Sequence, residues 1–246
     1  MAERWHTFPA QMGEHRAFIT FDEGYANEAK KDPRNVLVRV RAIIKNPNAA
    51  GMPTDGEFSA LSSLDEKLAT GVASHGGRFV GKVTVNGRRH FFYYVACSED
   101  AASELVQRAA RETGYELAYI YEEDSAKTGY WNDLYPTPDD WRMIKDLQIL
   151  DVLRDRGDAN SKAREVLHWA YFPDPQQAAR FGEWARAENY IVSGIEPAER
   201  ENRTKVRFSH VGTMVLEDIT GRTIAIDRKA RELDGDYDGW ETSIET

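Results

Sequence analysis

Apolar and polar residues alternate over 36–44, and this is the first strong pattern along the chain. Alternate side chains of a β-strand point to opposite faces, so the segment predicts a strand with one apolar face. Arg39 and Arg41 lie on its other face. Apolar residues then recur at helical spacing over 58–72, which predicts an amphipathic helix.

A β-hairpin is predicted next, because the strand-like segments 79–85 and 88–97 flank Asn86-Gly87. This dipeptide adopts positive φ at both central positions of a type I′ turn. A helix capped by Ser98 and a strand over 115–121 follow. The resulting order is β-α-β-β-α-β, which is typical of ferredoxin-like folds.

The periodicity fails over about 123–138, where Pro136 and Pro138 are unfavourable both in a helix interior and in a strand ladder. We therefore expect two domains joined here, one over 1–138 and one over 139–246, and limited proteolysis is expected to cut the joining segment first. The helix that follows, 141–153, has apolar residues on nearly every side. Such a helix needs burial all round, so we expect it to pack between the two domains.

The second half repeats the element order of the first. Its predicted elements are a strand over 166–171, a helix that begins at Asp174-Pro175, strands over 190–195 and 204–211, a helix over 216–233 and a strand over 237–242. A charged loop, 196–203, joins the two middle strands. The sequence thus predicts an α+β protein with two tandem ferredoxin-like domains, the second extended by an N-terminal helix.

Charge and composition narrow the class of protein. The chain has 246 residues, with 32 Lys and Arg against 41 Asp and Glu, and the formal net charge of −9 disfavours binding to nucleic acid or to anionic lipid. No apolar run approaches the roughly 18 residues that a membrane span needs. The single cysteine, Cys97, excludes an internal disulfide framework, and the first residues do not resemble a signal peptide. We therefore expect a cytoplasmic protein without direct contact to nucleic acid or membrane.

No cofactor or metal site is expected from the histidines, because none of the six stands at a ligand spacing. One alternative remains at the C-terminal end. Its acidic residues match the oxygen-ligand spacing of a calcium loop: Asp234, Asp236, Asp238 and Glu245. Glu241 stands where such a loop normally has an apolar residue, so a solvated acidic turn before an edge strand explains the same pattern.

Catalytic motifs are weak along the whole sequence. The glycine-rich segment 76–81 lacks the Lys-Ser/Thr ending of a phosphate loop and precedes a strand, so it indicates a tight turn. His168 beside Trp169 is more typical of a structural histidine than of a catalytic one. The alternative is a small-ligand-binding or hydrolytic enzyme in the first domain, with a pocket lined by four aromatic residues: Phe91, Phe92, Tyr93 and Tyr94.

Several segments of the second half resemble the family of the protein regulator of ribonuclease E activity B. They are Leu147–Leu153 with Gly157-Asp158, Val166–Phe172, Asn189–Val192 and, most specifically, Gly235–Glu241 with its Tyr-Asp-Gly-Trp core. The first half, 1–138, resembles an uncharacterised domain often found upstream of that module. The resemblance implies a small acidic protein that binds the ribonuclease and inhibits it by protein contact, without catalysis of its own.

We therefore expect a non-enzymatic module that binds a protein partner through its acidic C-terminal end, with a ribonuclease E-type enzyme as the candidate partner. The expected contact residues are Asp236, Tyr237, Asp238, Trp240 and Glu241, together with His168 and Trp169. Simple alternation would place Tyr237 and Glu241 on one face of the last strand, and Asp238 and Trp240 on the other. Trp240 is then either a core residue that closes the sheet or an exposed anchor for the partner.

Overall fold

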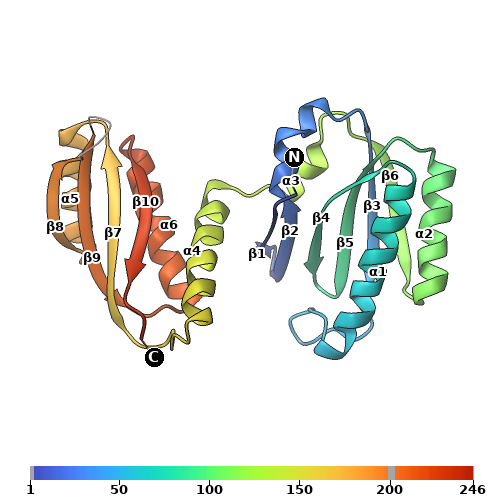
Figure 1. Cartoon of the computed structure of the whole chain (residues 1–246), viewed down its shortest axis with the longest axis horizontal. Coiled ribbons are helices and arrows are strands. Elements are labelled where there is room, and N and C mark those ends of the chain that lie inside the picture. Colours follow the sequence, from blue (N-terminus) through green and yellow to red (C-terminus); the bar gives the residue numbers. More distant parts are fainter. Residues whose placement is uncertain (1–2, 199–202, 246) are drawn as a thin grey trace. The chain divides into compact units, whose positions relative to one another are not determined.

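The computed structural model describes residues 3–198 and 203–245, and its chain divides into two compact units, Met1–Pro136 and Thr137–Thr246. Each unit has its own sheet (Figure 1). Four of the eight residues in the charged loop expected over 196–203, namely 199–202, lie outside the described residues. None of the described helices has the length and apolar character needed to cross a membrane.

The first unit has a six-stranded antiparallel sheet in the order β1-β2-β4-β5-β3-β6. The strands are β1 (Trp5–Met12), β2 (His15–Asp22), β3 (Val36–Ile43), β4 (Arg78–Val85), β5 (Arg88–Val95) and β6 (Leu117–Glu123). The helices are the 3₁₀ turns η1 (Glu23–Asn27) and η2 (Ala29–Lys31), then α1 (Asp55–Ser74), α2 (Glu99–Thr113) and α3 (Thr128–Asp133). The β1–β2 hairpin and α3 were not predicted from the sequence.

Local sequence signals account for the turns and caps of this unit. Asn86 and Gly87 have φ values of 46° and 69°, which confirms the hairpin turn between β4 and β5. The Ser98 hydroxyl accepts a hydrogen bond from the Ala101 amide at the start of α2, and Gly114 ends that helix in the left-handed conformation. The predicted boundaries of these elements are therefore set by short-range chemistry.

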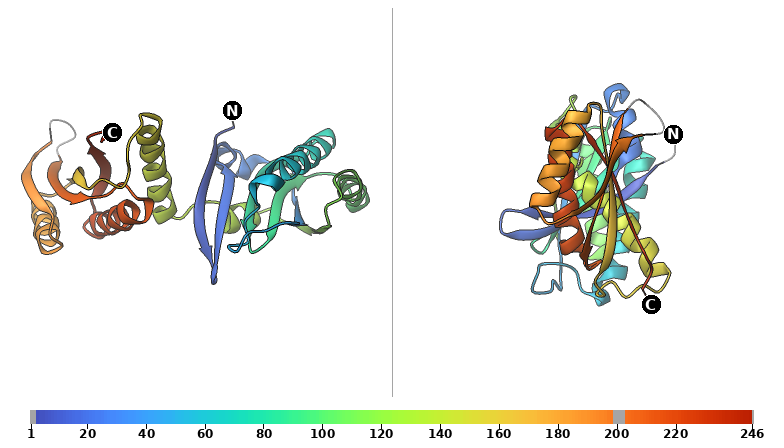
Figure 2. Two further views of the ribbon diagram at one scale, coloured as in Figure 1. Left: turned by 90° about the horizontal axis from the view of Figure 1, so that it is seen from below. Right: turned by 90° about the vertical axis from the view of Figure 1, so that its left-hand side faces the viewer.

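The two faces of the first sheet are covered differently. One face packs beneath α1 and α2, where a core forms from the alternate residues of β3 and β5 (Figure 2). The opposite face is partly covered by the turns η1 and η2 and by α3. The Tyr130 hydroxyl of α3 donates to the Asp22 carbonyl at 2.8 Å, and the Tyr94 hydroxyl of β5 donates to Asp124 at 2.7 Å.

The joining segment is shorter than expected. Lys127, Tyr130 and Leu134 are each at most 1% exposed, so residues 124–134 fold onto the first sheet instead of forming a linker over 123–138. A first proteolytic cut inside this stretch is therefore no longer expected.

The second unit has a four-stranded antiparallel sheet in the order β10-β7-β9-β8. Its elements are α4 (Pro138–Asp155), β7 (Arg164–Phe172), α5 (Pro175–Ala187), β8 (Ile191–Pro197), β9 (Thr204–Gly212), α6 (Leu216–Glu232) and β10 (Asp236–Thr242). Helices α5 and α6 lie on one face of the sheet (Figure 2) and bury an aromatic core that includes Phe172, Phe181 and Phe208.

Helix α4 belongs to the second unit. A capping box between Thr137 and Asp140 starts it. Asp139 binds Arg228 and Arg231 of α6, and the last two turns of α4 pack against Trp240. Leu150 and Leu153 bury one face of the helix within its own unit, whereas Val152 is 50% exposed, so the unit itself does not bury all the apolar residues of the helix.

Truncation should distinguish the junction predicted from the sequence, over about 123–138, from the junction in the structure, between Pro136 and Thr137. We expect fragments 1–136 and 137–246 each to unfold cooperatively, whereas fragment 1–123 should fail to fold because it lacks the buried Tyr130 and Leu134. Thermal unfolding followed by circular dichroism would test this. A cooperative transition for 1–123 at the same temperature as for 1–136 would contradict it.

Candidate functional site

A β-bulge at Asp238 determines which side chains of β10 face the core. Tyr237 pairs with Ala170, but the next paired residue, Gly239, is opposite Trp169, so Asp238 is the extra residue. Gly239 takes φ = 154°, a conformation that side chains disfavour. Simple alternation therefore fails, and Tyr237 and Trp240 both point inward.

Trp240 is a core residue whose indole is held by a buried carboxylate. It is 5% exposed, and its Nε1–H donates to Asp146 Oδ1 of α4 at 2.8 Å. The Thr223 hydroxyl of α6 donates to the other oxygen of Asp146, and the Arg142 guanidinium lies 3.6 Å from Oδ1. Burial raises the pKa of Asp146, while these donors and the Arg142 charge oppose that rise.

His168 lies in a second buried polar chain and is fully inaccessible. The Tyr237 hydroxyl is 2.7 Å from His168 Nδ1, and His168 Nε2 is 2.9 Å from His210 Nδ1. Burial lowers the pKa of His168 to about 2 and that of His210 to about 4, with Arg222 adding to both effects. Both imidazoles are therefore neutral at pH 7. His210 is the last member of this hydrogen-bonded series, and its Nε2 has no hydrogen-bond partner in the described part of the protein.

Four of the seven expected contact residues remain accessible. Asp236, Asp238 and Glu241 are exposed on β10, and Trp169 is half-buried on the outer face of β7. Asp236 accepts a hydrogen bond from Arg203 at 2.6 Å. The structure thus separates the expected set into an outer group that can meet a partner and an inner group that stabilises the sheet: Tyr237, Trp240 and His168.

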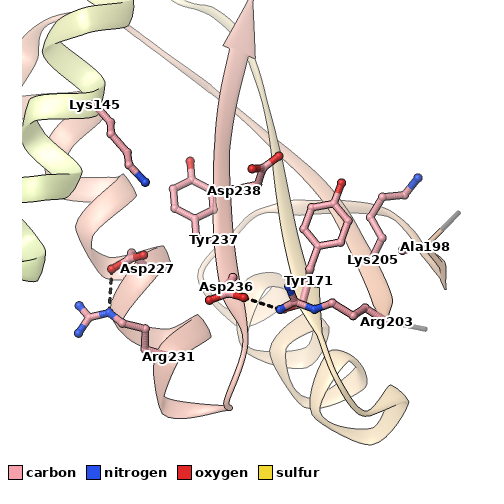
Figure 3. A pocket seen from close by; sticks show the side chains of 10 residues that line it. All are labelled: Lys145, Tyr171, Ala198, Arg203, Lys205, Asp227, Arg231, Asp236, Tyr237 and Asp238. Carbon is pink, nitrogen blue, oxygen red and sulfur yellow. Dashed lines mark hydrogen bonds and ion pairs between the residues drawn. The ribbon is translucent and has the colours of Figure 1, made fainter. Parts of the chain in front are cut away.

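A hollow of about 840 Å³ opens on this side of the sheet (Figure 3). Its lining side chains are Lys145, Tyr171, Ala198, Arg203, Lys205, Asp227, Arg231, Asp236, Tyr237 and Asp238. Four are basic and three are acidic. The surface is therefore not the purely acidic one expected from the net charge of the second half. Arg203, just before β9, contacts Tyr171 of β7 and Asp236 of β10, and so brings a cation to the carboxylates of β10.

A second hollow, of about 710 Å³, adjoins the first and shares Lys145, Tyr171 and Asp238 with it. Its other lining residues are Arg142, Gln148, Ile149, Val152, Trp169, Gly239, Trp240 and Glu241. We call the two hollows together the β10 groove. Apolar side chains are concentrated in its second part, which is lined by Ile149 and Val152 of α4 together with Trp169 of β7.

The calcium alternative does not fit the fold. Asp236 and Asp238 lie on an extended strand, so their carboxylates cannot wrap around one ion as in a calcium loop. Asp234 instead accepts a hydrogen bond from Gln177. Across residues 3–198 and 203–245, no group of three or more His, Cys, Asp or Glu residues could hold a metal ion.

The aromatic residues proposed to line an enzyme pocket in the first unit are core residues. Phe91, Phe92, Tyr93 and Tyr94 are each at most 2% exposed. Phe91 and Tyr93 pack beneath the helices, and the opposite face takes the other two. Because β5 is a central strand covered on both sides at this end, its aromatic residues stabilise the sheet instead of forming a cavity.

The polar residues that position this site were not predicted from the sequence. Arg142 and Asp146 stand four residues apart within an apolar helix, and that spacing was the available signal for an inward-facing pair. Thr223 and His210 gave no local signal, because their partners are more than 40 residues away in the sequence.

These features define a two-unit α+β protein with an open groove beside an edge strand. Two family models match it, one in each unit: a family of unknown function (DUF695) at residues 3–135, and Regulator of ribonuclease activity B (RraB) at residues 143–242. The first match spans more than half of the chain, so the chain belongs to the DUF695 family. The second match confirms the resemblance that the sequence of the C-terminal half indicated.

No curated protein matches the chain. Among solved structures, a crystal structure of an unknown protein from Galdieria sulphuraria is similar at 11% identity and a TM-score of 0.22. The alignment covers 85% of this chain and 99% of that one. A likeness at this level carries no argument about function.

The two buried histidines should make the second unit sensitive to acid. Their folded-state pKa values lie below the ordinary value of 6.5, so below pH 6.5 the unfolded chain takes up protons that the folded chain does not. The free energy of unfolding should therefore decrease as the pH falls from 6.5 to 4, by about 1.4 kcal/mol per pH unit for each histidine. Urea denaturation of fragment 137–246 across this range should show a shallower decrease in His210→Gln. An identical pH dependence in the two proteins would contradict the assignment.

Removing only the indole N–H should test the Asp146 contact. Trp240→Phe leaves Asp146 Oδ1 short of a donor and should lower the free energy of unfolding by about 1–3 kcal/mol. Trp240→Ala, which also empties the core position, should cost about 3–5 kcal/mol. Trp184→Phe, on α5 of the same unit, is the matched control. The contact would be unimportant if Trp240→Phe were as stable as the control.

Proposed function

We propose that the second unit is a protein-binding module that regulates a ribonuclease E-type enzyme by contact, without catalysis of its own. The observation that carries this proposal is the RraB match over residues 143–242, which spans most of α4 and the whole sheet. The β10 groove supplies a surface on which such contact can occur. His168 is buried and hydrogen-bonded to Tyr237, and it does not line the groove, which supports a structural role for this histidine.

The lining of the groove supports recognition of a protein segment that is both apolar and charged. An apolar surface is formed by Ile149, Val152 and Trp169. A large aromatic residue such as Trp169 often contributes much of the binding free energy of an interface. Lys145 and Asp238, at the junction of the two hollows, can pair with charges that flank the anchor. The partner would then meet side chains of both α4 and the sheet.

We also propose that both units are ferredoxin-like domains and that they fold independently. When the strands of each β-α-β-β-α-β unit are numbered in chain order, both sheets have the order 4-1-3-2 with antiparallel neighbours, and this supports the assignment. In the first unit, β1 and β2 extend this sheet beyond β4. The single cysteine supports a cytoplasmic setting.

The proposal can be tested with the full chain and the catalytic half of a ribonuclease E-type enzyme from the same organism. Isothermal titration calorimetry should detect binding at micromolar concentrations, and Trp169→Ala should weaken it at least tenfold because the aromatic anchor is lost. Val211→Ala, an exposed apolar residue on β9, is the control and should bind as the unmodified chain does.

Two results would overturn parts of this proposal. Undetectable binding of the unmodified chain would exclude the ribonuclease as partner. Equal binding by Trp169→Ala and Val211→Ala would place the contact away from the β10 groove. Circular dichroism would first establish that both variants fold.

A further inference from the structure

Three arginines gather on the face of the first sheet that α1 and α2 leave uncovered. Arg39 and Arg41 lie on β3, where the alternate residues Val38 and Val40 belong to the helix-covered core. On the neighbouring strand β5, His90 pairs with Arg41, and Arg88 follows two residues away on the same face. Strand pairing therefore brings together four nitrogen-rich side chains that are far apart in the sequence.

The positive charge of this group is only weakly balanced. Arg39 contacts Asp133 at 3.5 Å, and both side chains are more than a third exposed. Arg41 Nε is buried and has no hydrogen-bond partner in the described residues. Burial and then the charges of Arg39, Arg41 and Arg88 lower the pKa of His90. The charged groups that lower the pKa of this imidazole are all cations, so a bound anion would offset their effect.

A hollow of about 290 Å³ lies at the same place. It is lined by Arg39, Arg41, His90, Ala118, Tyr119 and Ile120. Ala118 on β6 pairs with Arg41, and its short side chain leaves room above the strand. The volume is at the lower limit of small-molecule sites, so it fits a compact ligand.

We propose that the first unit binds the phosphate group of a small phosphate monoester in this hollow. A guanidinium presents its N–H donors in a plane that matches two phosphate oxygens, and a phosphate monoester carries nearly two negative charges that can pair with Arg39 and Arg41, the two arginines that line the hollow. A neutral His90 adds one further donor. A small ester is favoured over a polynucleotide because the chain has a net charge of −9 and the basic group is confined to a single hollow.

This site is separate from the β10 groove, since its residues belong to the other unit. The outcome of a phosphate-binding experiment is therefore independent of whether the second unit regulates a ribonuclease.

Calorimetry on the full chain with adenosine 5′-monophosphate and with inorganic phosphate tests the proposal. We expect both probes to bind at low ionic strength, and Arg41→Gln and Arg39→Gln, which each remove a lining guanidinium, to weaken binding at least tenfold. The Arg39 side chain is 37% exposed, so its variant keeps the test valid if Arg41→Gln disturbs folding. Arg108→Gln, an exposed arginine on α2, is the matched control and should change nothing.

The probes also separate the source of the phosphate. If inorganic phosphate bound more tightly than the nucleotide, the organic part would contribute nothing to binding, and the proposal that the ligand is a phosphate monoester would be wrong. Tighter binding of a twelve-nucleotide single-stranded RNA, lost in Arg41→Gln, would overturn the choice of a small ligand. Absence of binding, or equal weakening by Arg108→Gln, would overturn the site itself.

A titration of His90 by nuclear magnetic resonance locates the anion. A bound phosphate offsets the three guanidinium charges, so the pKa of His90 should rise when adenosine 5′-monophosphate is saturating. An unchanged pKa at saturation would show that the nucleotide binds elsewhere.

Discussion

The second unit depends on one buried carboxylate. Asp146 is fully inaccessible, and an ionised carboxylate without partners would be very unfavourable there. Its partners come from three elements: Trp240 from β10, Thr223 from α6 and Arg142 from α4 itself. Each donor is needed to stabilise the buried carboxylate. Because two of the donors come from β10 and α6, their hydrogen bonds to Asp146 fix the position of α4 beside the sheet edge. The groove along that edge exists because α4 is held there.

Much of the fold follows from short-range signals, and the misses have physical causes. Asn86-Gly87 and Gly114 act through their own backbone conformation, and the Ser98 hydroxyl acts on an amide three residues away, so the elements they delimit could be predicted. Strand β1 was missed because Pro9 interrupts a strand-like pattern; such a proline is tolerated on an edge strand, and β1 is one. The β1–β2 hairpin therefore had no clear sequence signature.

The candidate site was only partly predictable for a different reason. Tyr237 and Trp240 share one face because of a bulge, and an inserted residue cannot be recognised from alternation alone. The mixed charge of the β10 groove arises from the register of β9 against β7 and of β7 against β10, which is long-range information. The arginine group on the first sheet likewise requires the pairing of β3 with β5.

The bulge at Asp238 also affects how the second sheet ends. A regular edge strand exposes unpaired N–H and C=O groups that can pair with a strand from another molecule. On β10 the bulge interrupts this ladder, and three exposed carboxylates line the same strand: Asp236, Asp238 and Glu241. Like charges would oppose the approach of a second copy of β10. This edge is therefore protected against sheet-to-sheet aggregation, and association there must proceed through side chains.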